Sequence, residues 1–175
     1  MSIVLVRHTR PAVGGDICYG RTDLALADSF ERDARTVVAS LRESDVLITS
    51  PLRRCRMLAD EIGSAFGLVP QTDDRVQEMD FGDWEGRPWS DIPRNELDEW
   101  ARDFLHARPH RGESVAMLRE RTLLAIADYR ASRRRHIVVT HSGIIKAALA
   151  TGDSAEHFST RADFGAAIEL PDRGV

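Results

Sequence analysis

The chain has 175 residues, of which 42% are apolar and 30% charged, and its net charge is −4. This length favours one domain with its own hydrophobic core, and the composition is that of a globular protein. The small acidic excess argues against a protein that coats nucleic acid, because such proteins carry a strong basic excess. Every basic residue except Lys146 is an arginine. We attribute most of that bias to composition, although arginine also suits the recognition of anions.

Cysteine usage and the N-terminus indicate the compartment. Cys18 and Cys55 form no CxxC pair and no disulfide framework, which suits a reducing environment. The apolar run at Ile3–Val6 is too short for a signal peptide, and no stretch approaches the roughly 20 apolar residues of a membrane span. His106 and His110 are interpreted as surface residues rather than metal ligands. We therefore expect a cytoplasmic protein with no membrane segment, no metal and no cofactor.

The apolar pattern predicts alternating strands and helices along the chain. In chain order these are a strand at 3–6, a helix at 28–41, a strand at 46–49, a helix from Ser50–Pro51 to Phe66, a weak strand at 69–71, a helix at 113–129, a strand at 137–140, a helix at 144–150 and an edge strand within 165–170. This alternation favours the α/β fold class, a three-layer sandwich with a largely parallel central sheet and helices on both faces.

Residues 79–112 differ from the rest in character. All three tryptophans lie here among prolines and charged residues, and 90–106 has a helical pattern. We expect one domain over 1–175, from which 79–112 forms a cap-like excursion. Trp84 is expected in the core, whereas Trp89 and Trp100 are candidates for capping a substrate pocket. Simple packing of both rings onto the core is the alternative.

Polar residues follow three of the predicted strands directly. Arg7 and His8 follow the first, Ser50 and the arginine-bearing helix with Arg54 follow the second, and His141 follows the fourth. The carboxyl ends of parallel strands form one edge of a sheet, where α/β proteins bind ligands. The N-terminus of the arginine-bearing helix adds a positive dipole and free backbone amides.

Two imidazoles beside arginines constitute a site for an anion. Neutral imidazole is a competent nucleophile near pH 7, and guanidinium groups neutralise the oxygens of a transferring phosphoryl group. The residues thus favour phosphoryl transfer through histidine.

Five motifs, in this order, resemble those of the histidine phosphatase superfamily, the phosphoglycerate mutase-like proteins. They are LVRHT at Leu5–Thr9, SPLRRC at Ser50–Cys55, EMDFGDWEG at Glu78–Gly86, GES at Gly112–Ser114 and VVTHSG at Val138–Gly143. Together they span about four-fifths of the chain. Any one of them alone would be weak, but the set is specific.

The resemblance implies a double displacement without a metal. His8 would attack phosphorus and become phosphohistidine, while Arg7, Arg54 and His141 hold the phosphoryl oxygens. Glu78 would protonate the leaving alcohol and then activate water. Only the resemblance singles out Glu78. The implied partner is a small phosphomonoester, and the oligomeric state stays open.

Two departures from the family pattern bear on the substrate and on phosphate binding. Thr9 replaces the usual glycine, and the common downstream asparagine is absent, so the hydroxyl of Thr9 or Thr22 is expected to replace one phosphate ligand. The pattern RHT-x-P followed by CYG-x-TD is similar to that of the α-ribazole phosphatases, which act on a cobalamin precursor. The alternatives are a phosphomutase, a protein phosphohistidine phosphatase and a phosphate-binding module without turnover.

Overall fold

A five-stranded sheet forms the centre of residues 2–171, the part of the chain that the computed structural model describes. Across the sheet the strands are β3 (Gln71–Thr72), β2 (Val46–Thr49), β4 (His136–Thr140), β1 (Ile3–Arg7) and β5 (Ala167–Glu169). The first four run parallel, and β5 pairs antiparallel with β1 at the edge. This is the largely parallel sheet that the sequence predicts.

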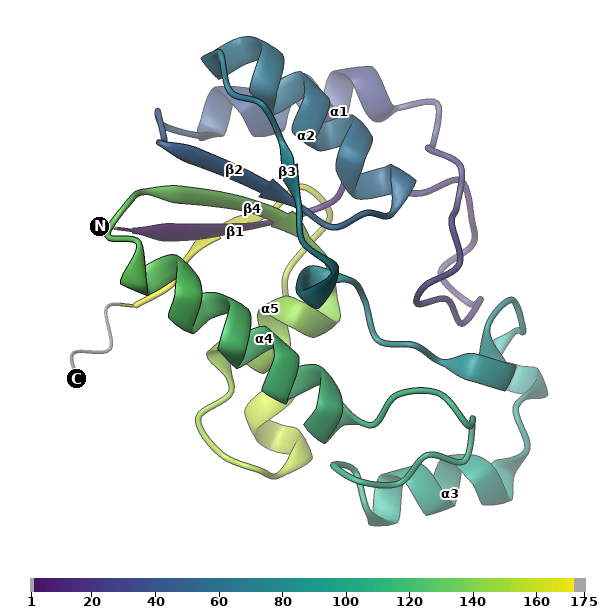
Figure 1. The fold of residues 1–175 in the computed structure, drawn as a ribbon. Helices are drawn as coiled ribbons and strands as arrows, with labels where there is room; N and C mark the ends of the chain where they lie inside the picture. The colour runs from purple at the N-terminus through teal and green to yellow at the C-terminus, as the bar shows by residue number, and fades with distance from the viewer. Residues whose placement is uncertain (1, 172–175) are drawn as a thin grey trace.

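Helices cover both faces of the sheet (Figure 1). One face carries α1 (Phe30–Ser40) and α2 (Arg53–Phe66), and the other carries α4 (Val115–Ala131) and α5 (Ser142–Leu149). The β-branched runs of β2 and β4 are buried along their whole length, as expected of strands covered on both faces. The predicted three-layer α/β sandwich is confirmed.

Strand register sets the position of the polar strand ends. Arg7 of β1 pairs with Thr140 of β4, and Thr49 of β2 pairs with Val139. Beyond the strands, the His8 amide donates to the Thr140 carbonyl at 3.0 Å, and the Ser50 amide donates to the Val139 carbonyl at 3.0 Å. The segments that follow β1, β4 and β2 therefore begin side by side at the same edge of the sheet.

Two local predictions are wrong in detail. Helix α2 begins at Arg53 with Leu52 at the N-cap position, not at Ser50–Pro51, and the Ser50 hydroxyl contacts the imidazole of His141. The amide of Arg53 donates to the Asp23 carboxylate at 2.7 Å, so this end of α2 is capped by a loop rather than left free. The weak strand is also shorter than expected, since β3 pairs through two residues only and Val69 is 82% exposed.

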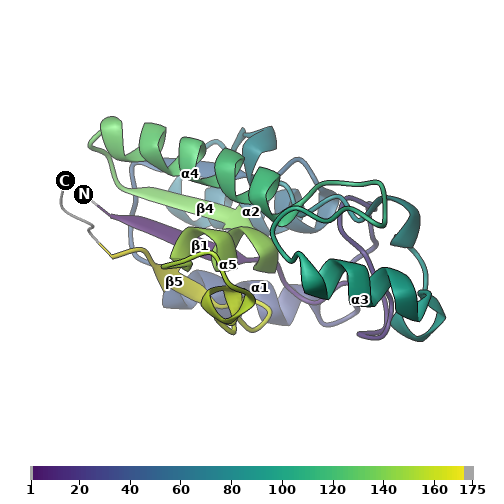
Figure 2. The same cartoon turned by 90° about the horizontal axis from the view of Figure 1, so that it is seen from below.

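Residues 79–112 extend beyond the carboxyl ends of the strands, where α3 (Arg94–Arg102) lies to one side of the sheet (Figures 1 and 2). The helix is shorter than the predicted 90–106 and follows a single 3₁₀ turn at Trp89–Asp91. Trp84 is fully buried, as predicted, and its indole donates to Glu96 at 2.7 Å. The surface position expected for His110 is wrong: its ring is buried 4.8 Å from that of Trp84.

Three further 3₁₀ turns complete the described chain. They are Asp74–Val76, Gly82–Trp84 and Ala155–Phe158. Among residues 2–171, no helix combines the length and apolar character needed to span a membrane.

Candidate active site

His8 lies just beyond β1 with its imidazole buried. Its Nδ1 is 2.7 Å from the backbone carbonyl of Thr9. A carbonyl only accepts hydrogen bonds, so Nδ1 carries the proton and Nε2 keeps its lone pair. This tautomer is the one that a nucleophilic Nε2 requires.

Burial and positive neighbours keep His8 neutral. Burial, and then the charge of Arg54, lower the pKa of His8 to about 3. The same two causes hold the pKa of His141 well below its usual value. Both imidazoles are therefore uncharged near pH 7, and their rings lie 5.1 Å apart, edge to face.

Two guanidinium groups flank the imidazoles. Arg54 is fully buried on the first turn of α2 and donates to the carbonyls of Thr22 at 2.8 Å and Gly20 at 2.5 Å. Arg7 donates to the carbonyl of Ala162 at 2.7 Å, and its guanidinium lies 3.9 Å from the centre of the Phe164 ring. These contacts fix both groups before any ligand binds.

Three buried polar atoms of this site have no hydrogen-bond partner within residues 2–171. They are the Nε atoms of Arg7 and Arg54 and the hydroxyl of Thr9. An unpaired buried donor costs free energy, roughly 1–3 kcal/mol each. Three such donors near two neutral imidazoles are able to bind the oxygens of an anion.

His141 is contacted by Ser50, which follows β2, and by Cys55 of α2. Its Nε2 lies 2.8 Å from the Ser50 hydroxyl and 3.4 Å from the Cys55 sulfur. Burial raises the pKa of the Cys55 thiol, so this neighbour stays uncharged. Ser50 thus orients an imidazole, and its hydroxyl also accepts from the Leu52 amide at 3.4 Å.

Glu78 reaches the site from the segment after the 74–76 turn. Its Oε1 accepts from the Met79 amide at 2.9 Å, and its Oε2 accepts from the Gly143 amide at 3.1 Å, at the start of α5. A Cβ on Gly143 would lie 2.1 Å from Oε1, so a larger residue would displace the carboxylate from this position. Two backbone donors therefore fix Glu78, and its charge acts on Arg7.

The predicted hydroxyl ligands differ in their surroundings. Thr9 is buried beside His8, with its hydroxyl unpartnered as described above. Thr22 is exposed, and its hydroxyl donates to Glu85, which also accepts from the amides of Arg21 and Thr22. Thr22 therefore holds the loop that receives Arg54, and its role as a phosphate ligand stays a prediction.

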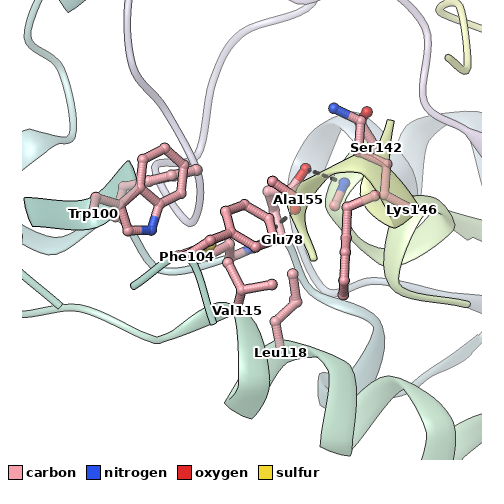
Figure 3. A pocket seen from close by; sticks show the side chains of 12 residues that line it. Glu78, Trp100, Phe104, Val115, Leu118, Ser142, Lys146 and Ala155 are labelled. Atoms are coloured by element: carbon pink, nitrogen blue, oxygen red, sulfur yellow. Dashed lines mark hydrogen bonds between the residues drawn. The ribbon is translucent and has the colours of Figure 1, made fainter. Parts of the chain in front are cut away.

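A cavity of about 260 Å³ opens beside Glu78 (Figure 3). Trp100 lines it, together with Phe104 and Lys146. Trp89 does not belong to the lining and packs edge-on against Phe81 and Trp84. Of the two tryptophans proposed as cap residues, the structure thus brings only Trp100 to the cavity. No group of three or more possible metal ligands occurs in the described part of the chain.

Four side chains at the site were not singled out from the sequence for a role in it. Tyr19 hydrogen-bonds Arg7 and lies 5.5 Å from the Arg54 guanidinium, measured to its ring centre. Phe164 supports Arg7, Ser50 orients His141, and Lys146 lines the cavity. Helical spacing offers a signal for Lys146 alone, since it lies one turn after Ser142 on the helix that follows His141.

The family model described as histidine phosphatase superfamily (branch 1) matches residues 3–162. The chain belongs to this superfamily. A relative from Mycobacterium tuberculosis, glucosyl-3-phosphoglycerate phosphatase, is 29% identical over 162 residues, which cover 83% of this chain and 72% of the relative. The adenosylcobalamin/α-ribazole phosphatase of Escherichia coli K12 is 30% identical over 160 residues, covering 86% and 78%.

Solved structures of histidine phosphatases have the same fold. A mycobacterial glucosyl-3-phosphoglycerate phosphatase complexed with VO3 has a TM-score of 0.84 and 26% identity, covering 96% of this chain and 91% of that one. A putative α-ribazole-5′-P phosphatase from Escherichia coli K-12 has a TM-score of 0.85 and 25% identity, covering 98% and 91%. We assign the chain to the phosphoric monoester hydrolases of the histidine phosphatase type.

Proposed function

We propose that this histidine phosphatase hydrolyses small phosphomonoesters through a phosphohistidine on His8, without a metal. The observation that carries the proposal is the Nδ1–Thr9 hydrogen bond, which leaves the Nε2 lone pair of a neutral imidazole beside two guanidinium groups, the buried one of Arg54 and the half-buried one of Arg7. The arginines supply the positive charge that a metal supplies in other phosphoryl-transfer sites.

In the first step, Nε2 of His8 attacks phosphorus and the bond from phosphorus to the leaving oxygen breaks. Arg7, Arg54 and His141 receive the charge on the phosphoryl oxygens. Glu78, protonated, gives its proton to the leaving oxygen, which departs as an alcohol. The negative charge acquired by Glu78 is held by the two backbone amides that already bind it.

In the second step, Glu78 accepts a proton from a water molecule as that water attacks phosphorus. The P–N bond breaks, inorganic phosphate forms, and His8 returns to its neutral state. Glu78 is protonated again and ready for the next substrate. We further propose that residues 79–112 act as the cap of this single domain, with Trp100 contributing to the wall on the leaving-group side.

The test is release of phosphate from p-nitrophenyl phosphate in excess EDTA, with wild type, His8→Asn and His136→Asn. His136 is the matched control, because it is a buried histidine at the other end of β4, stacked on Tyr129. We expect His8→Asn to lose at least about 10³-fold in kcat. Acid-labile phosphate should be trapped on wild type and on His136→Asn. A His8→Asn rate above one-tenth of wild type would overturn the mechanism.

Two candidate substrates follow from different observations. The RHT-x-P and CYG-x-TD patterns favour α-ribazole 5′-phosphate, and a relative at 30% identity carries that activity in its name. Relatives named glucosyl-3-phosphoglycerate phosphatase favour a phosphomonoester that also carries a carboxylate. A panel that includes both compounds decides between them, and a tenfold preference in kcat/KM corresponds to about 1.4 kcal/mol of transition-state binding.

A further inference from the structure

Lys146 stands apart from the other basic residues. It is the only lysine of the chain and lies in the last turn of α5, half-buried. Many of the arginines pair with carboxylates, as Arg119 does with Asp153 at 2.5 Å. The side chain of Lys146 has no ion-pair or hydrogen-bond partner within residues 2–171. The carboxylate of Glu78 lines the same cavity but is bound by two backbone amides, so the cation of Lys146 remains available for an anion that comes from outside the chain.

The cavity that Lys146 lines has apolar walls. Aromatic and aliphatic side chains form most of its surface: Phe81, Trp100, Phe104, Val115, Leu118 and Phe158. Among the described lining residues, Glu78 carries the one carboxylate and Lys146 the one positive charge (Figure 3). Walls of this kind exclude water and strengthen any charge pairing that forms between them.

The position of the cavity relates it to the leaving group. Glu78 lines it and is also the residue that, under the proposed function, protonates the leaving oxygen. The alcohol part of a substrate must therefore lie within reach of this carboxylate. A volume of about 260 Å³ accommodates an alcohol of roughly the size of one aromatic ring with substituents.

Resting on the proposed function, we propose that Lys146 determines specificity by pairing with a carboxylate on an apolar leaving alcohol. A carboxylate fits better than a second phosphate, because one ammonium group is a single point charge and no arginine fork lines the cavity. The substrate class is thus a phosphomonoester whose alcohol has an apolar body and one carboxylate. Of the two candidate classes above, this favours the carboxylate-bearing one.

A purely structural role for Lys146 makes a different prediction. A cation in the last turn complements the dipole of α5, and removing it would cost stability with every substrate alike. A specificity role changes the ratio between a carboxylate-bearing substrate and its uncharged analogue. The ratio therefore separates the two roles.

The experiment compares kcat/KM for 3-carboxyphenyl phosphate and phenyl phosphate. The variants are Lys146→Met, Lys146→Gln and Lys146→Arg, with Arg42→Met as the control for loss of one exposed positive charge at the other end of the sheet. The intrinsic reactivity of the two leaving groups cancels, because each variant is compared with wild type on the same pair. We expect the ratio to fall at least tenfold in both uncharged variants, which corresponds to about 1.4 kcal/mol. It should stay within threefold in Lys146→Arg and Arg42→Met.

Each outcome has one meaning. An unchanged ratio in Lys146→Met and Lys146→Gln overturns this inference while the proposed function stands. A wild-type kcat/KM for α-ribazole 5′-phosphate ten times that for 3-carboxyphenyl phosphate also overturns it, since that substrate has no carboxylate. Failure of wild type to release phosphate from either ester refutes the proposed function itself, and the inference with it.

Discussion

The buried neutral state of His8 makes a quantitative prediction about stability and pH. The pKa of His8 is about 3 in the folded protein, against an ordinary value of 6.5 in the unfolded chain. Between these two values the unfolded chain takes up a proton that the folded protein does not. Stability must therefore fall as the pH drops below 6.5, and the fall continues until about pH 3.

The magnitude follows from the gap between 6.5 and the working pH. At pH 4.5, two units below 6.5, proton binding by this residue favours the unfolded chain by about 3 kcal/mol relative to pH 7.5. His8→Asn removes the titrating group while keeping a side-chain N–H for the Thr9 carbonyl. The other buried histidines titrate in both proteins, and the two largest causes of the lowered pKa of His141, its burial and Arg54, are kept in the variant, so most of their contribution cancels in the comparison.

The assay is urea denaturation of wild type and His8→Asn at pH 7.5 and 4.5, in buffers without phosphate, followed by tryptophan fluorescence. We expect wild type to lose about 3 kcal/mol more than His8→Asn between the two pH values. The absolute stability of the variant at pH 7.5 does not enter this difference. Equal losses in the two proteins would refute the conclusion that His8 is held neutral by its surroundings.

Three further predictions concern the reaction. Glu78→Gln should lower kcat/KM for alkyl phosphates by about 10²–10⁴. For p-nitrophenyl phosphate the loss should be less than about tenfold, because p-nitrophenolate leaves without a proton. Equal losses on both substrates would contradict the acid role of Glu78. Gly143→Ala should displace the Glu78 carboxylate, so kcat/KM should again fall more for alkyl phosphates than for p-nitrophenyl phosphate. An alkyl phosphate rate equal to wild type would show that the close approach of Gly143 to the carboxylate does not matter for the reaction. Arg54→Met should reduce kcat/KM for p-nitrophenyl phosphate by about 10²–10³ and raise the inhibition constant of inorganic phosphate as a competitive inhibitor. An unchanged inhibition constant would show that Arg54 does not bind the phosphate.

The arrangement of the site agrees with a histidine that must stay unprotonated and a carboxylate that must change its protonation state. His8 and His141 lie where water is excluded, beside buried positive charge. Glu78 is half-buried at the wall of a cavity and is bound by two amides. The burial that lowers the pKa of both imidazoles thus suits the nucleophilic task proposed for His8.

Much of the fold could be predicted from local pattern. Short β-branched runs such as Val46–Thr49 and Ile137–Thr140 indicate strands covered on both faces, and a parallel sheet follows from their alternation with helices. The convergence of the segments carrying His8, Ser50 and His141 also follows, because parallel strands end at one edge. The structure confirms that convergence through the strand register.

Side-chain partners could not be predicted in the same way. Ser50 looks like a helix cap in the sequence and instead contacts an imidazole 91 positions away. The contact of Thr22 with Glu85 of the 79–112 segment has no signal in the sequence, and His110 looks like a surface residue but fills an aromatic cluster. Each of these outcomes depends on a segment distant in the sequence, and periodicity carries no information about such contacts.

The sequence by itself determined which central strands are buried and at which edge of the sheet the polar strand ends gather, because both follow from local periodicity and from the geometry of parallel strands. Only the tertiary structure decided which hydrogen bonds orient His8 and His141, which carboxylate the Gly143 amide holds, and that the chain's one lysine lines an apolar cavity beside it. The physical reason is that the orientation of a side chain and the charges around it depend on atoms of separate segments that lie within a few ångströms of it. Folding alone brings those atoms together.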